Sequence, residues 1–228
     1  MRAVVPPKWL SILKLGPFAF LRQLARDTGA IAMIEFAYTL PVFVGFGLVG
    51  IECTNLVLAH QKAERIASTL ADQVAGNMIP PNEAQIGDMF EAANQIAAPF
   101  EFDGEGNAII TAVLGAYDVA EDEVQNKIAW QRCSAQGRIT SGIGREWAGS
   151  DNIAEGPQVD LPNDIELDQN EMVIVTEVYF PYRPIVSQAL VDGFVGEDSV
   201  LKEVSVFRTR GDVLFSVTPV LEVPTHSC

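Results

Sequence analysis

The chain has 228 residues, of which 48% are hydrophobic, and its formal net charge at pH 7 is −15. Only one of its 30 acidic residues precedes residue 29. The rest of the chain therefore repels the phosphates of DNA and RNA, and this excludes a nucleic-acid-binding protein. The chain has two histidines, His60 and His226, so few arrangements with a histidine base, such as a catalytic triad, are available. We therefore expect no enzyme activity, no catalytic residue and no cofactor.

Residues 1–29 form a basic leader arm with five Lys or Arg residues and one Asp. An apolar run follows over residues 30–51, in which Glu35 is the only charged side chain. A helix of 22 residues is about 33 Å long, which is enough to cross a bilayer. Because basic flanks stay in the cytoplasm, the sequence predicts a single-pass membrane protein with its N-terminus inside. A signal peptide has a shorter apolar core, although cleavage at Ala59 or Ala63 stays an alternative.

Glu35 is the one charged residue in this apolar run, and its position there requires an explanation. An ionised carboxylate inside a bilayer costs on the order of a few kcal/mol, and such residues commonly have a functional partner. The alternative is an ordinary membrane anchor that tolerates one acid near the lipid headgroups. Pro41 and the glycines that follow it are expected to bend or loosen the helix within the membrane.

A one-sided apolar stripe over residues 61–75 indicates that the helix continues beyond the membrane to about residue 77. Gly76 and two prolines then end this element. Asn82, with Gln85 three residues later, predicts the N-cap of a second helix that packs on a sheet. We therefore divide the chain into the arm, a helix over 30–77 and a domain over 78–228.

The domain has the pattern of strands separated by turns. The predicted strands share a high content of Val, Ile and aromatic residues, and they cover 108–117, 125–133, 171–180 and 200–210, with 212–217 as a further strand or a continuation. The polar stretch 134–170 is expected to be a surface excursion with at most a helical turn near Trp147. The fold class is α+β, with a long N-terminal transmembrane helix, an antiparallel sheet and a packed helix.

The three cysteines fall into two groups. Cys53 lies near the apolar run, where we expect a small buried hydrophobic residue. Cys133 and Cys228 remain as an even pair outside the membrane, either as a disulfide or as two free thiols. We expect no metal site, because the acids at 160–171 do not have the spacing of a calcium loop and are better explained as solvated.

The segment RDTGAIAMIEFAYTLPVFVGFGLVGIE, followed by HQKAERIASTLADQVA, resembles the N-terminal region of the TadE-like pseudopilins of tight-adherence (Flp-type, type IVb-like) pili. The matching positions include Gly29, Glu35, Phe36 and Pro41. Three later segments are similar to strands of those proteins, namely WQRC at 130–133, VYFPYRPI at 178–185 and VSVFRTR at 204–210.

The resemblance implies a minor pilin or pseudopilin of the bacterial inner membrane, with a pilin-like helix and a periplasmic domain. Its implied partners are other pilins or pseudopilins, the inner-membrane assembly platform, prepilin peptidase and membrane lipid. The helix would assemble through Glu35, Phe36 and Pro41, and the protein would take part in pilus assembly, adhesion and secretion. The alternatives are a membrane-anchored periplasmic adaptor or sensor module with an uncleaved anchor, and a membrane-anchored periplasmic enzyme.

In that family the peptidase removes the arm, and the new amine becomes the cationic partner of the glutamate. The family glutamate is the fifth residue after the cleaved glycine, whereas Glu35 is the sixth after Gly29. Cleavage between Ala30 and Ile31 would restore the spacing, with alanine in place of glycine. The other interpretation keeps the arm, and the protein then stays in the membrane.

Overall fold

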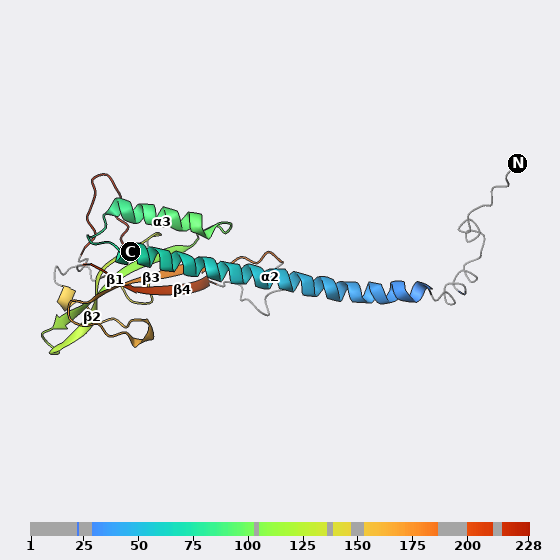
Figure 1. Ribbon diagram of the computed structural model, residues 1–228, viewed down its shortest axis with the longest axis horizontal. Coiled ribbons are helices and arrows are strands. Elements are labelled where there is room, and N and C mark those ends of the chain that lie inside the picture. The colour runs from blue at the N-terminus through green and yellow to red at the C-terminus, as the bar shows by residue number, and fades with distance from the viewer. Residues whose placement is uncertain are drawn as a thin grey trace. The chain divides into compact units, whose positions relative to one another are not determined.

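A computed structural model describes residues 22, 29–102, 105–135, 139–146, 153–186, 200–211 and 216–228. In these residues the chain forms two helices and one antiparallel sheet of four strands (Figure 1), which confirms the α+β class. The leader arm up to residue 28, except Arg22, the segment at Trp147 and residues 212–215 of the uncertain fifth strand lie outside the described residues. Contacts divide the chain into two compact units, residues 1–51 and residues 52–228.

Helix α2 covers Gly29–Ala75 and passes from the first unit into the second. The stripe predicted from the spacing is buried: Ile66, Leu70 and Val74 are all fully inaccessible to solvent. This part of the helix is therefore a core element of the domain, and by its contacts it belongs to the unit that begins at Glu52. The reason is that an amphipathic stripe of this length is stable only against a second apolar surface.

Helix α3 covers Glu83–Ala97 and begins with the capping box that the sequence predicts. The Asn82 side chain accepts a hydrogen bond from the Gln85 backbone at 2.9 Å, and the Gln85 side chain accepts one from the Asn82 backbone at 3.0 Å. Both bonds satisfy amides that the first helical turn leaves unpaired. At the other end of α3, Lys62 of α2 donates to the carbonyl of Ile96 at 3.0 Å.

The sheet has the order β2-β1-β3-β4, and all neighbouring strands are antiparallel. Its strands agree with the predicted ones within two residues at either end: β1 covers Asn107–Asp118, β2 Glu123–Cys133, β3 Met172–Pro181 and β4 Val200–Arg208. One face of the sheet carries alternate residues that belong to the same apolar cluster as both helices, among them Ile110, Trp130, Ile174 and Phe180.

The opposite face of the sheet is covered by the chain between β2 and β3. The residues Val159, Leu161 and Leu167 are buried there against Val113 and Val175. The Asn126 side chain fixes this segment by donating to the carbonyl of Ile165 at 2.9 Å and accepting from the amide of Leu167 at 3.3 Å. In its described part the segment has two short 3-10 helices, Ile153–Glu155 and Pro162–Asp164, and this part is a layer of the domain and not a surface excursion.

Candidate functional site

The first part of α2 is an uncovered apolar surface. Each side chain from residue 31 to residue 51 is exposed, and Met33, Tyr38, Phe43 and Phe46 are each at least 72% exposed. An added methyl group at Gly45 or Gly47 would meet nothing within 4 Å. Among the described residues, α2 is the one helix that by length and composition could cross a membrane, and 11% of its most apolar window is buried.

Glu35 and Phe36 both lie on this surface. Glu35 is exposed and has no hydrogen-bond or ion-pair partner among the described residues, and Phe36 is 61% exposed. The carbonyl of Phe36 accepts a hydrogen bond from the Thr39 hydroxyl at 3.2 Å. The carboxylate of Glu35 is therefore free to interact with a group outside the described chain.

Pro41 lies inside α2 without ending it. Its ring has no backbone N–H, so the carbonyl of Ala37 lacks the usual donor four residues later. Gly29, Ala30 and Ile31 form the beginning of the same helix, and the side chain of Ile31 is 53% exposed. The bonds considered for processing thus lie in the first helical turn.

The first residue of the domain unit, Glu52, is a buried carboxylate that the sequence analysis did not single out. It is 4% exposed, and its Oε2 accepts hydrogen bonds from the backbone amides of Ile185 and Val186, each at 3.0 Å. Its Oε1 accepts a hydrogen bond from the hydroxyl of Tyr182. That hydroxyl also accepts one from Asn55 at 2.9 Å.

These bonds fix the chain after β3 to the position at which the apolar run ends. Burial, together with the hydrogen bond to Glu52, raises the pKa of Tyr182 to about 12, so the hydroxyl stays protonated and donates to the carboxylate. In the sequence, the only sign of this buried site is that Glu52 is the first acidic residue after the apolar run. Its partners lie 130 residues or more away, and no local pattern connects them.

Cys53 is exposed, which corrects the expectation of a buried residue. It follows Glu52 on α2, and Glu52 turns toward the domain while Cys53 does not. Cys133 and Cys228 form a disulfide with a Cα–Cα distance of 5.2 Å. The structure thus brings together two of the candidate residues that lie 95 positions apart.

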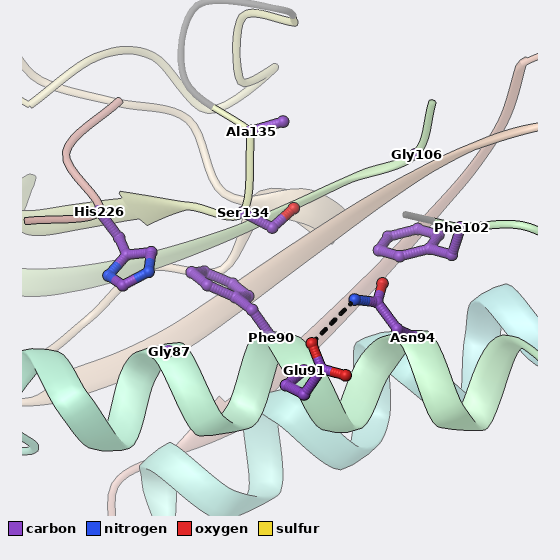
Figure 2. Close-up of a pocket in the computed structure, with 9 residues that line it drawn as sticks. All are labelled: Gly87, Phe90, Glu91, Asn94, Phe102, Gly106, Ser134, Ala135 and His226. Carbon is purple, nitrogen blue, oxygen red and sulfur yellow. Dashed lines mark hydrogen bonds between the residues drawn. The ribbon is translucent and has the colours of Figure 1, made fainter. Parts of the chain in front are cut away.

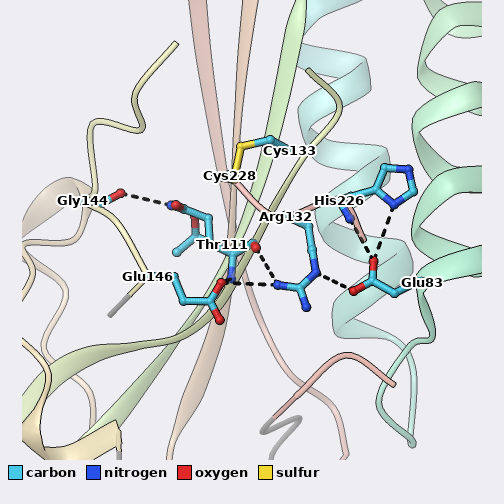
Figure 3. A network of polar contacts seen from close by, with 9 residues as sticks. Glu83, Thr111, Arg132, Cys133, Gly144, Glu146, His226 and Cys228 are labelled. Carbon is cyan, nitrogen blue, oxygen red and sulfur yellow. Dashed lines mark hydrogen bonds and ion pairs between the residues drawn. A yellow bond between two sulfur atoms is a disulfide. The ribbon is translucent and has the colours of Figure 1, made fainter. Parts of the chain in front are cut away.

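A charged network surrounds this disulfide at the start of α3 (Figure 3). Glu83 is 1% exposed, and its Oε1 accepts a hydrogen bond from Nε of Arg132 at 2.8 Å. Its Oε2 accepts one from the backbone amide of His226 at 3.3 Å. Arg132 also donates to Glu146 at 3.3 Å, so the network connects α3, β2, the segment after β2 and the C-terminal segment.

A third buried carboxylate lies on the opposite face of the sheet. Glu177 is fully inaccessible, and it accepts hydrogen bonds from the Ser141 hydroxyl, from the amide of Gly142 at 3.0 Å and from the hydroxyl of Tyr179 at 3.1 Å. The ammonium of Lys202 lies 2.8 Å away and compensates its charge. These contacts hold the described residues 139–146 on the sheet, and they are structural.

A pocket of about 230 Å³ lies between α3 and the ends of β1 and β2 (Figure 2). The rings of Phe90, Phe102 and His226 line it together with Gly87, Glu91, Asn94, Gly106, Ser134 and Ala135. The Ser134 hydroxyl is engaged by the backbone amide of Ala108 at 2.9 Å. In the described part of the chain no three His, Cys, Asp or Glu side chains are grouped as a metal site would need. We assign no reaction to this pocket.

In comparisons with family models, with curated proteins and with solved structures, nothing matches the chain.

Proposed function

We propose that this protein is a minor pilin or pseudopilin-like structural component of a tight-adherence (Flp-type) pilus system, anchored in the bacterial inner membrane and assembled through α2. The single observation that supports this best is the contrast within α2. Its first part is exposed at each position from 31 to 51, and most of these residues are apolar, whereas the stripe after Glu52 is buried in the domain. A helix of a soluble protein rarely exposes so many contiguous apolar side chains.

The proposed topology has the arm in the cytoplasm and the domain in the periplasm. The basic residues of the arm favour the cytoplasmic side. The Cys133–Cys228 disulfide agrees with an oxidising compartment such as the periplasm. The partners are then lipid, other pilins or pseudopilins, the assembly platform and prepilin peptidase.

Glu35 is the residue that we propose to direct assembly. Its carboxylate has no partner among the described residues, and it lies in a surface made of apolar side chains. An acid in lipid is stabilised when a cationic group of another polypeptide pairs with it. The pair would fix the register at which neighbouring helices pack.

The test of this function compares Glu35→Gln with Tyr38→Phe in the native host. Both residues are exposed on α2, but only the first change removes a charge. We expect Glu35→Gln to abolish piliation while the protein still fractionates with the membrane, and Tyr38→Phe to leave piliation normal. Normal piliation with Glu35→Gln would favour the membrane-anchored adaptor or sensor, and loss of the protein from membranes would contradict the anchor itself.

Processing is tested separately by mass spectrometry of the protein extracted from membranes. A new N-terminus at Ala30 or Ile31 supports removal of the arm by the peptidase. A chain that keeps the arm from Met1 contradicts processing, and a bitopic component of the assembly complex then remains.

A further inference from the structure

The contacts of Glu52 determine where one loop of the domain lies. Glu52 follows Ile51 directly, and Ile51 is the last residue of the apolar run. Through its side chain Glu52 binds the amides of Ile185 and Val186 and the hydroxyl of Tyr182. Whatever the tilt of the helix, residues 182–186 therefore lie within side-chain reach of the point at which the apolar run ends.

The same loop and the neighbouring beginning of β4 expose side chains that the described chain covers only in part. Ile185 is 68% exposed although its backbone amide is hydrogen-bonded. Val200, at the beginning of β4, pairs with Pro181 in the sheet and is 47% exposed. Arg183 lies between Tyr182 and Ile185 in the sequence, and its side chain is 73% exposed.

We propose that residues 183–186, together with Val200, form a second contact with the membrane, at the headgroup layer of the outer leaflet of the inner membrane, while the buried Tyr182 holds them to Glu52. We call these residues the interfacial loop. This inference rests on the proposed function, because it requires residues 30–51 to cross the bilayer. Glu52 would then lie at the bilayer surface, and the loop bound to it would lie at the same depth.

The chemistry of the loop suits that depth. An aliphatic side chain such as Ile185 gains free energy when it enters the boundary between headgroups and acyl chains. A guanidinium such as that of Arg183 binds lipid phosphate with two parallel hydrogen bonds. Arg183 already pairs with Glu105, whose side chain is 43% exposed, so phosphate would share or replace an accessible partner and not a buried one.

The charge of the rest of the domain restricts this membrane contact to the loop. A chain with a net charge of −15 is repelled by anionic lipid, so the domain as a whole has no tendency to lie on the membrane. A single apolar and cationic loop next to the end of the span would hold one side of the domain at the surface. It would thereby limit rotation of the domain around the helix axis, which matters for a subunit that has to present one surface to its neighbours.

The experiment measures quenching of a fluorophore by lipid in vesicles of phosphatidylcholine and phosphatidylglycerol that contain the full chain. The background is Cys53→Ser, because Cys53 is exposed and would react with the label, whereas the other two cysteines are joined in a disulfide. Labels are placed at Ile185→Cys, at Val44→Cys in the apolar run, and at Leu221→Cys. Leu221 is the matched control, since it is an aliphatic side chain of the domain that is 91% exposed.

We expect the label at position 185 to lose fluorescence to lipids that carry a doxyl group near the ester carbonyl. The label at position 44 should lose fluorescence to lipids with the doxyl group deep in the acyl chain, and the label at position 221 to neither. If position 44 is quenched and position 185 is quenched no more than position 221, the interfacial loop is refuted while the membrane span stands. If position 44 is not quenched, the span and the loop both fail.

Aqueous iodide distinguishes lipid from a protein cover. A label at position 185 that is shielded from iodide and also from the doxyl lipids is covered by protein, such as a second copy of the chain, and this outcome overturns the proposal. Shielding from iodide together with quenching by lipid supports it.

Discussion

The guanidinium of Arg132 and the carboxylate of Glu83 form a buried ion pair, with Nε and Oε1 2.8 Å apart and side-chain exposures of 12% and 1%. Arg132 lies next to the last residue of β2, and Glu83 is the first residue of α3. The pair therefore connects the helix layer to the edge of the sheet. A carboxylate this deeply buried depends on its cationic partner, because removal of that partner leaves an uncompensated charge.

We expect Arg132→Met to lower the free energy of unfolding by roughly 3 to 5 kcal/mol. Urea denaturation of the detergent-solubilised full chain measures this change, with the fluorescence of the buried Trp130 as one signal. The control is Arg208→Met, since Arg208 pairs with Glu171 but its side chain is 66% exposed. Its cost should be about 0 to 1 kcal/mol, and equal losses for both variants would contradict our assignment of Glu83 as the dependent partner.

Tyr182→Phe removes the hydroxyl that donates to Glu52, and we expect a loss of roughly 1 to 3 kcal/mol of stability at neutral pH. The same hydroxyl predicts a pH dependence. Burial and the hydrogen bond to Glu52 raise the pKa of Tyr182 from 10.0 to about 12. A pKa that is higher in the folded state gives a contribution that is complete below pH 10 and is lost as the pH rises through about 12.

Stability measured between pH 9 and about 12 should therefore fall with a steeper slope in the parent protein than in Tyr182→Phe. An identical slope in the two proteins would show that the tyrosine titrates without linkage to folding. Tyr38→Phe also removes one tyrosine and is the control, because the side chain of Tyr38 is 77% exposed.

Gly115→Ala should destabilise the domain by about 1 to 3 kcal/mol. A Cβ atom at this position of β1 would lie 2.2 Å from the carbonyl oxygen of Asp168, which is backbone and cannot rotate away. The neighbouring amide and carbonyl of Gly115 also bind Glu171 and Asn170, each at 2.9 Å, so the two segments cannot simply separate. Thermal unfolding followed by circular dichroism measures the effect.

Gly45→Ala is the matched control for this change, since an added Cβ atom at position 45 meets nothing within 4 Å. We expect the unfolding of the domain to be the same as in the parent. A destabilised Gly45→Ala protein would mean that the assay reports helix contacts between copies and not the domain alone.

Reduction of the Cys133–Cys228 disulfide should lower the free energy of unfolding by about 4 to 5 kcal/mol if the loss of a loop constraint over 95 residues dominates. Melting temperatures with and without dithiothreitol measure this, and Cys228→Ser should behave like the reduced protein in both conditions. Limited proteolysis shows which part of the chain becomes accessible first after reduction. Cleavage after reduction should begin in residues 216–228, because only non-covalent contacts, such as the hydrogen bond of 2.7 Å from the amide of Cys133 to the carbonyl of His226, then hold this segment to β2.

The parts of the fold that follow from local patterns were predictable. The capping box at Asn82 and Gln85, the buried stripe of α2 and the four strands each depend on residues that are neighbours in the sequence. Hydrophobic periodicity and capping chemistry act over that range. The apolar run with Glu35 was equally visible, because its length alone sets it apart.

The parts that depend on distant partners were not predictable. Val159 and Leu167 are isolated apolar residues in a polar stretch, and they are buried only because Asn126 and the face of β1 and β3 receive that stretch. Glu52 and Glu177 looked like ordinary acids, since the donors that satisfy them come from loops and strands far along the chain. The sequence also does not reveal which surface buries the stripe of α2, because the residues that cover it lie elsewhere in the chain.

The second half of α2 runs beside β4, with His60 bound to Glu203 at 2.8 Å and the amide of Arg210 bound to the carbonyl of Ala75 at 3.0 Å (Figure 1). Traction along this helix would act on the sheet in shear, because the buried stripe has to slide past the strands as a whole. Tension is then shared among many contacts and is not concentrated on one bond after another. Resistance to such a load is set by the rate of unfolding and not by the equilibrium stability.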